Sequence, residues 1–189
     1  MAVHRPRTVR ADFHPRFEAT GRRYEYFLGR ASPLRASRVW EPPSEPDPEL
    51  LRRGTSLLAG RRSFEALSHA GQPHLGFDCT VESAAWNRTR LGDLRFTIVA
   101  DRFLHRMVRY LVATLVDVGR GRRALGEWEA LLETGHGRPP EPAPPTALYL
   151  TGVRYADGWN RPAGVPGLWP IAAGGPGARR AAAGETKAE

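Results

Sequence analysis

An arginine-rich segment that leads directly into a long apolar run constrains this chain more than any other feature. The segment spans residues 102–109 (RFLHRMVR), and the apolar run ends near Val118. Read as a helix, this stretch places four basic side chains on one face at i, i+3, i+4 and i+7, namely Arg102, His105, Arg106 and Arg109. Its apolar residues form the complementary stripe, namely Leu104, Val108, Leu111, Val112 and Leu115. The pattern predicts a helix that buries one side and presents fixed positive charge on the other.

The distribution of charge indicates a polyanionic partner. The formal net charge is +8, the sequence pI is about 10.6, and arginine supplies 27 of the 28 basic residues. Residues 85–123 hold nine arginines and only three acidic residues, so the two signs do not alternate as they do on an ordinary solvated face. Together with the basic helix, this asymmetry favours nucleic acid as the partner.

Several classes of protein are disfavoured by what the sequence lacks. No apolar run approaches the roughly 20 residues of a membrane span, and the basic N-terminus is not followed by the apolar stretch of a secretory signal. Cys79 is the only cysteine, which excludes disulfides and cysteine-based zinc sites and favours a cytoplasmic location. The histidines show no metal-ligand spacing, and no phosphate-binding loop or nucleophile elbow is present. Asp78 is expected to raise the pKa of the neighbouring Cys79 thiol, so a catalytic thiolate is not favoured.

The pattern of apolar and turn residues predicts an α+β fold. Strands are expected at 22–30, 80–88, 94–100 and 148–155, and helices at 47–60, from 102 to 119 or 121, and at 126–134. Asp47 is expected to cap the first helix, with Pro48 at its first position and Gly60 at its end. This order suits a mixed or antiparallel sheet with helices packed on one face, in the manner of split βαβ folds. The other face of such a sheet is open and can serve as a nucleic-acid platform.

Composition divides the chain into a folded domain over residues 1–156 and a tail over residues 157–189. The tail consists largely of Gly, Pro, Ala and Arg and has little apolar surface to bury. It is therefore expected to be disordered.

Three segments together resemble the A-type tRNA pseudouridine synthases. Residues 12–17 with Ala19-Thr20 and 22–26 (DFHPRF, AT and RRYEY) are similar to the family's DFHARFSAT-x-RRYRY. Residues 103–109 (FLHRMVR) are similar to FLHHMVRN, and the last segment, ALYL at 147–150 with VRY at 153–155, is similar to GLYLVAVRY. The segments keep the family's order and spacing over residues 12–155, which is 144 of the 189 residues.

The resemblance implies an isomerase that converts uridine to pseudouridine in the anticodon stem-loop of tRNA, without a cofactor and as a homodimer. In that reaction an aspartate attacks a nucleotide that has been flipped out of the RNA. Tyr24 matches the family's active-site tyrosine, which stacks on the target base and is a candidate for the proton-removal step; without the motif, it reads as a half-buried strand tyrosine. Arg109 matches the arginine that pairs with the catalytic aspartate; without the motif, it is one more phosphate-facing arginine. Arg102, His105 and Arg106 are expected to contact the RNA backbone.

The family's catalytic aspartate has no counterpart among the matched segments. It belongs to a GRTD-x-GVHA loop upstream of them, and the nearest likeness, Arg7-Thr8-Val9, ends in a valine that cannot attack. Asp12 belongs to the later DFH segment and is not expected to be the nucleophile. Asp101 and Arg102 also stand where the family has Asn-Ala. The chain therefore resembles the second half of a two-lobed enzyme and is expected to be inactive unless an N-terminal half complements it.

Three interpretations remain open. The leading one is a truncated or split tRNA pseudouridine synthase that binds tRNA. The second is a non-catalytic RNA-binding module, and the third is a basic scaffold protein with no pocket for a flipped base. Half of a two-lobed enzyme exposes a sheet edge and apolar surface, which predicts that the chain dimerises or aggregates.

Overall fold

The computed structural model describes residues 8–30, 32, 38–69, 76–135, 137–156 and 158–160, the last three through their backbone only. Its helices, strands and 3-10 turns (η) follow the chain in the order β1 (Gly21–Leu28), α1 (Pro48–Ser56), β2 (Gly60–Ser63), η1 (Glu65–Leu67), β3 (Asp78–Arg88), β4 (Leu94–Ala100), α2 (Met107–Gly119), α3 (Leu125–Thr134), η3 (Pro145–Ala147), β5 (Leu148–Tyr155) and β6 (Gly158–Asn160).

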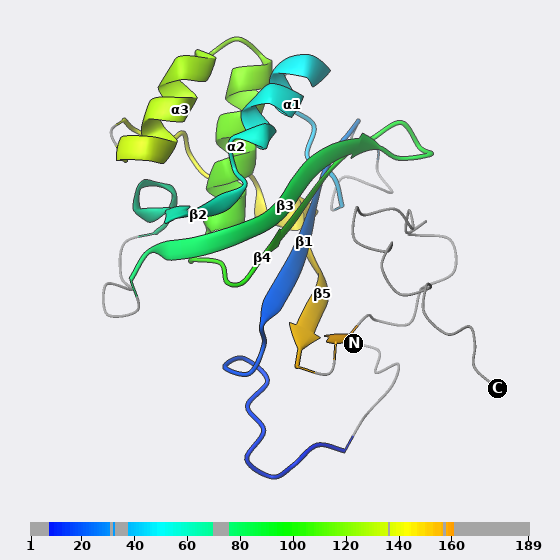
Figure 1. Cartoon of the computed structure of the whole chain (residues 1–189). Helices are drawn as coiled ribbons and strands as arrows, with labels where there is room; N and C mark the ends of the chain where they lie inside the picture. Colours follow the sequence, from blue (N-terminus) through cyan, green and yellow to red (C-terminus); the bar gives the residue numbers. More distant parts are fainter. Residues whose placement is uncertain are drawn as a thin grey trace, which may run out of the picture. The chain divides into compact units, whose positions relative to one another are not determined.

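The strands form one sheet in the order β2-β3-β4-β1-β5-β6, and every neighbouring pair is antiparallel. The three α-helices lie together on one face of this sheet (Figure 1). The α+β class and the helix layer are therefore confirmed, and the choice between a mixed and an antiparallel sheet falls on the antiparallel one.

The side chains of β1 alternate between the two faces of the sheet. Tyr26 and Leu28 point toward the helices and are fully buried or nearly so, and Tyr24 packs against the same core. Arg23 and Phe27 occupy the alternate positions on the helix-free face, since successive strand residues point to opposite sides. Across the strand pair, Tyr24 and Tyr26 lie opposite Ile98 and Phe96 of β4.

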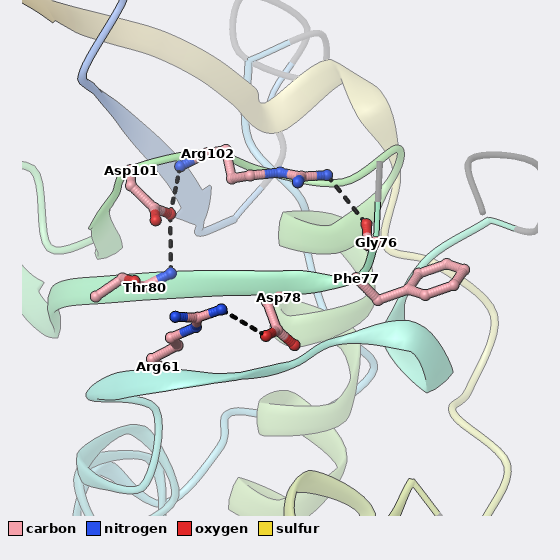
Figure 2. A pocket seen from close by; sticks show the side chains of 7 residues that line it. All are labelled: Arg61, Gly76, Phe77, Asp78, Thr80, Asp101 and Arg102. Atoms are coloured by element: carbon pink, nitrogen blue, oxygen red, sulfur yellow. Dashed lines mark hydrogen bonds and ion pairs between the residues drawn. The ribbon is translucent and has the colours of Figure 1, made fainter. Parts of the chain in front are cut away.

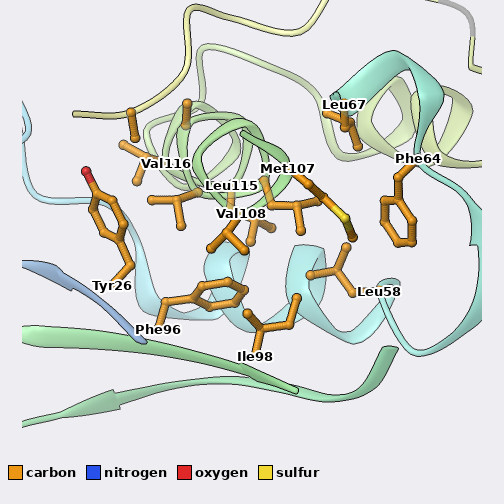
Figure 3. Packing of buried hydrophobic residues seen from close by; sticks show 14 of the residues in the cluster. Tyr26, Leu58, Phe64, Leu67, Phe96, Ile98, Met107, Val108, Leu115 and Val116 are labelled. Carbon is orange, nitrogen blue, oxygen red and sulfur yellow. The ribbon is translucent and has the colours of Figure 1, made fainter. Parts of the chain in front are cut away.

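The core fills the space between the sheet and the helices. Figure 3 shows Tyr26, Phe96 and Ile98 from the strands pointing toward Val108 and Leu115 of α2. The five residues of the predicted apolar stripe are all buried, at 5% exposure or less. The sequence pattern thus identified the inward side of this segment correctly, and the burial of these apolar side chains stabilises the packing of the helices on the sheet.

Helix α1 begins as its sequence predicts and ends earlier than expected. The Asp47 carboxylate accepts hydrogen bonds from the backbone N–H groups of Glu49 (2.7 Å) and Leu50 (3.0 Å), and Pro48 occupies the first helical position. The helix ends at Ser56, and Gly60 instead starts β2 with a φ of +100°. The expected role of Gly60 as the helix terminator was wrong, because the chain needs that positive φ to turn into an edge strand.

Helix α2 does not include the basic segment that precedes it. The helix starts at Met107, after Arg106 adopts a left-handed conformation with a φ of 62°. The predicted helical face of Arg102, His105, Arg106 and Arg109 was therefore wrong, since only Arg109 belongs to the helix. The Asp101 carboxylate accepts the Arg102 N–H at 2.6 Å, and this local side-chain bond competes with the helical pattern.

The sheet extends further at both edges than the sequence indicates. Strand β2 was not predicted, because GRRS carries no apolar alternation and is mostly exposed. Strand β6 pairs with β5 and lies inside the stretch 157–189 that was expected to be a disordered tail. The rest of that stretch lies outside the described residues, so the tail beyond Asn160 stays a prediction.

An ion pair crosses the helix-free face at the end of the sheet where β1 begins. Arg154 of β5 donates to Glu82 of β3 through both terminal guanidinium nitrogens, one of them at 2.9 Å. The guanidinium passes directly over Gly21, where a Cβ would approach it to 2.9 Å. A side chain at Gly21 would therefore displace the Arg154 guanidinium from this position, and the ion pair itself links β5 to β3.

Candidate active site and RNA-facing surface

Tyr24 lies on the helix side of β1, close to the start of the strand. It stands opposite Ile98 of β4 and Leu150 of β5, and its side chain is half-buried against the core. Burial raises the pKa of the Tyr24 phenol, and the nearby Arg22 guanidinium partly offsets this rise. The phenol is therefore neutral at physiological pH, with its ring held at the border between core and solvent.

Two apolar side chains surround the Tyr24 ring. The Phe103 ring meets it edge-on, with centroids 5.0 Å apart and planes at 84°. Leu150, directly across the strand pair, is 52% exposed. An exposed leucine next to two aromatic rings forms an apolar ledge of the kind on which a flat base can stack.

Arg109 projects from the third position of α2 and is held by the segment that leads into β5. Its Nε donates to the Ala143 carbonyl at 2.5 Å, and the Ala143 N–H donates back to the Arg109 carbonyl at 3.1 Å. The Tyr26 hydroxyl donates to the neighbouring Pro144 carbonyl at 2.8 Å. Burial raises the pKa of Tyr26, and the charge of Arg109 opposes this rise. The backbone at 143–144 is thus held by hydrogen bonds from both α2 and β1.

Tyr24 and Arg109 share the same side of the sheet. Tyr24 and Tyr26 lie two residues apart on the same face of β1. The charge of Arg109 partly offsets the rise in the pKa of Tyr26 that burial causes, so Arg109 lies near this face as well. Among the described residues, no carboxylate forms an ion pair with Arg109. The guanidinium is therefore positioned by a backbone carbonyl and keeps its terminal nitrogens for another acceptor.

The segment between β4 and α2 is held in place by polar contacts that sequence reasoning missed. The Asp101 carboxylate accepts the N–H groups of Thr80 (2.8 Å) and Arg102 (2.6 Å). Arg22 donates to the Asp101 carbonyl (2.6 Å), and also to the Ala19 carbonyl at 2.8 Å. These bonds fix the path of the chain immediately before Phe103. In the sequence, only the motif around Phe103 marks this segment.

The predicted backbone-binding residues fall into two places. His105 and Arg106 are exposed immediately before α2. The His105 ring meets that of His69 at a centroid distance of 5.3 Å, and the His105 carbonyl accepts the His69 N–H at 3.0 Å. Arg102 instead extends toward Gly76 and donates to its carbonyl at 3.2 Å, where it lines a separate cavity (Figure 2). The three residues therefore do not form one surface.

None of the described aspartates forms a hydrogen bond or an ion pair with Tyr24 or Arg109. Three of them face arginines, since Asp12 pairs with Arg10 (2.9 Å), Asp78 with Arg61 (3.0 Å) and Asp117 with Arg122 (3.8 Å). Asp47 caps α1, and Asp101 accepts hydrogen bonds from backbone N–H groups. Asp93 is buried beside Gly29, where an added Cβ would clash with the Asp93 carboxylate. Asp12, which is 80% exposed, has the surroundings of a surface residue.

Other chemistry receives no support from the part of the chain that the structure describes. Burial raises the pKa of the Cys79 thiol to about 11, and Asp78 adds to that rise as the sequence predicted, although burial is the larger cause. No group of three or more potential metal ligands occurs among the described residues. No described helix is long and apolar enough to cross a membrane.

Comparison with known proteins assigns the family. A family model described as tRNA pseudouridine synthase matches residues 55–156. "tRNA pseudouridine synthase A" of Chlorobaculum tepidum is 38% identical over 158 residues, which cover 82% of this chain and 63% of that protein. The protein of the same name from Neisseria gonorrhoeae strain FA 1090 is 36% identical over 159 residues, which cover 82% of this chain and 60% of that protein. That of Chromobacterium violaceum is 35% identical over 176 residues, with 86% and 63% covered.

The matched part of the chain thus spans about three fifths of the length of these relatives. The family model covers the segment from the last residues of α1 through β5, including Phe103, Arg109 and the cavity around Arg102. Tyr24 precedes the region of the family model, and the longer pairwise matches extend beyond that region. The chain belongs to the tRNA pseudouridine synthase family.

Proposed function

We propose that this chain provides the base-stacking and RNA-gripping part of an enzyme that isomerises uridine to pseudouridine in the anticodon stem-loop of tRNA. The observation that carries the proposal is the half-buried Tyr24 ring, flanked by Phe103 and an exposed Leu150 on the same side of the sheet as Arg109. The similarity to relatives named tRNA pseudouridine synthase A supports the same reaction.

Tyr24 acts on the flipped base by stacking. Because burial raises its pKa, the phenol stays protonated and can donate a hydrogen bond, whereas a phenolate base would be rare at neutral pH. The neighbouring rings and Leu150 give the base an apolar surface that compensates for the stacking it loses on leaving the RNA.

Arg109 receives a carboxylate. Its Nε is already committed to the Ala143 carbonyl, so the two terminal nitrogens are pre-oriented for a forked contact. An aspartate held there is kept ionised by the positive charge, which suits a nucleophile.

The reaction is an isomerisation in which no atom is gained or lost. The aspartate carboxylate attacks the flipped nucleotide, and the bond between the ribose and N1 of uracil breaks. The base rotates, rejoins the sugar through C5, and the C5 proton is released to solvent while N1 takes up a proton. The aspartate is regenerated, so the reaction needs no external oxidant, reductant or cofactor.

In this proposal the nucleophile lies on a segment that carries the family's GRTD motif, which does not occur in this sequence. No described aspartate forms a hydrogen bond or an ion pair with Tyr24 or Arg109. We infer that the 189-residue chain binds tRNA but turns over only when a segment carrying that aspartate joins it, on the same polypeptide or a second one. Association as a homodimer and a cytoplasmic location belong to the same proposal.

His105 and Arg106 contact the RNA backbone in this arrangement, and Arg102 contacts RNA at its own cavity. The phosphate contacts of His105 and Arg106 position the RNA without reading its sequence. The second candidate function, a non-catalytic RNA-binding module, is favoured by the one observation that Arg109 has no carboxylate partner among the described residues.

Binding measured against salt tests the proposal. Fluorescence anisotropy with a labelled tRNA anticodon stem-loop should show affinity falling roughly 10- to 40-fold between 50 and 200 mM KCl, as expected for two to three phosphate contacts. A blunt RNA duplex of equal length, which offers no unpaired uridine, should bind more weakly at every salt concentration. Equal affinity for both RNAs, or no binding, would overturn the proposal.

A further inference from the structure

A second concave site lies between β2, the start of β3 and the segment that follows β4. Its volume is about 550 Å³, and it is lined by Arg61, Gly76, Phe77, Asp78, Thr80, Asp101 and Arg102. Figure 2 shows the Arg61 and Asp78 side chains facing each other along β2 and β3, with Asp101 and Arg102 on the neighbouring segment.

The cavity opens on the helix-free face of the sheet. Arg61 pairs in register with Thr80, and directly paired residues of antiparallel strands share a face. Cys79 and Val81, which alternate with Thr80, are buried in the core beneath the helices. The cavity is therefore separate from the site around Tyr24, although Arg102 and Phe103 are consecutive residues and link the two.

Each charged group of the cavity has a hydrogen-bond partner among the other lining residues. Asp101 binds the N–H groups of both Thr80 and Arg102, so its carboxylate anchors the wall to β3. The Arg102 guanidinium contacts the Gly76 carbonyl at 3.2 Å, and Arg61 contacts Asp78 at 3.0 Å. Both guanidiniums and both carboxylates thus stand at the rim before any ligand arrives.

The charge balance indicates the chemistry of the ligand. Two arginines and two aspartates sum to zero, so a phosphate entering the cavity would meet two carboxylates as well as two guanidiniums. A neutral planar group with donors and acceptors along one edge fits better. Guanine offers N1–H and N2–H donors to a carboxylate, and O6 and N7 acceptors to a guanidinium.

We propose that this cavity is a second nucleobase site, which holds an unpaired guanine of the bound RNA between Asp78 and Arg102. The inference rests on the proposed function for the identity of the partner as RNA. Single-stranded RNA is commonly read in this way, by hydrogen bonds to the edges of splayed bases. The site anchors the RNA on the face opposite the target uridine.

The test uses the full chain and three probes: the pentanucleotides AAGAA and AAIAA, and guanosine monophosphate. Inosine differs from guanosine only in lacking the exocyclic amine, which would donate a hydrogen bond to Asp78. We expect AAGAA to bind about 5- to 150-fold more tightly than AAIAA, the range for one forked base contact. Amide shifts in NMR spectra should concentrate at Gly76–Thr80 and at 101–102.

Variants separate the cavity from the Tyr24 site. Asp78→Asn should abolish the preference for guanine over inosine, and Arg102→Gln should weaken AAGAA binding. Arg88→Gln is the matched control, since it also breaks an exposed arginine–carboxylate pair, to Glu45, away from the cavity. It should leave the guanine preference unchanged.

Equal affinity for AAGAA and AAIAA, or a guanine preference that survives Asp78→Asn, would overturn the assignment of the cavity as a guanine site. Guanosine monophosphate binding as tightly as AAGAA would assign the cavity to a free nucleotide and overturn the RNA assignment. Failure of anticodon stem-loop binding with the guanine preference intact would refute the proposed function alone.

Discussion

The ring of Phe103 stands edge-on to the ring of Tyr24, with centroids 5.0 Å apart. This contact joins the segment that follows β4 to β1, the strand that carries Tyr24. Asp101 and Arg22 hold that segment by hydrogen bonds, so the position of the Tyr24 ring depends on polar contacts several residues away. If Tyr24 stacks on RNA as proposed, this surface is fixed before RNA binds, which lowers the entropic cost of binding.

Replacement of Tyr24 measures its stacking contribution. Tyr24→Ala should cost about 1–3 kcal/mol of affinity for an anticodon stem-loop, while Tyr24→Phe should retain most of it because the ring remains. Phe27→Ala is the matched control, since Phe27 lies on the same strand but contacts Tyr149 on the opposite face. An equal loss for Tyr24→Ala and Phe27→Ala, measured by fluorescence anisotropy, would show that Tyr24 does not stack on RNA.

Arg109 should affect turnover far more than binding. In the presence of a segment that supplies the aspartate, Arg109→Ala should lower tritium release from 5-tritiated uridine in tRNA by a factor on the order of 10² to 10³, because the carboxylate loses its partner. Arg109→Lys keeps the charge but loses the forked geometry and should recover only part of the rate. Arg53→Ala, in the last turn of α1, is the control. A fall in RNA affinity as large as the fall in rate would instead make Arg109 a phosphate contact.

Asp101 should contribute to the stability of the fold. Asp101→Ala leaves the N–H groups of Thr80 and Arg102 without their acceptor, and this should lower the free energy of unfolding by about 1–3 kcal/mol. Asp12→Ala removes an equally charged side chain that is 80% exposed and should change stability by less than about 0.5 kcal/mol. Urea denaturation distinguishes the two, and indistinguishable midpoints would contradict the role given to Asp101.

Glu25 should make stability depend on pH. It is 7% exposed on the helix-free face, and burial raises the pKa of its carboxyl, with Arg95 and Arg23 opposing the rise. Because the folded state holds this proton more tightly than the unfolded state, the associated stability is present below the ordinary carboxyl pKa and is lost as the pH rises through the folded value. Glu25→Gln should therefore raise the melting temperature at pH 7 and have little effect at pH 4. A Glu25→Gln variant less stable than wild type at pH 7 would show that the arginines outweigh burial.

Much of the fold could be predicted from periodicity and capping. The bounds of β4 and β5, the Asp47 cap of α1 and the burial of the α2 stripe all follow from local patterns that tertiary packing reinforces. Edge strand β2 could not be predicted, because an exposed strand needs no apolar alternation.

The start of α2 shows why the basic face was misplaced. Four basic residues at helical spacing predict a continuous helix, but the chain must first turn back from β4 over the sheet. In this turn the Asp101 carboxylate accepts the Arg102 N–H, and Arg106 adopts a left-handed backbone conformation. Neither feature appears as a periodicity in the sequence. Tyr24 and Arg109 were found through motifs, whereas the cavity around Arg61 and Arg102 arises from strand register that no local pattern contains.

The most direct test of the account is tritium release from 5-tritiated uridine in tRNA, measured with the 189-residue chain alone and with an added segment that carries the GRTD aspartate of a relative. The account predicts no release above background from the chain alone, salt-sensitive tRNA binding under the same conditions, and release once the aspartate is supplied. Release by the chain alone would contradict it and would make Asp12, Asp78 and Asp101 the aspartates to replace first.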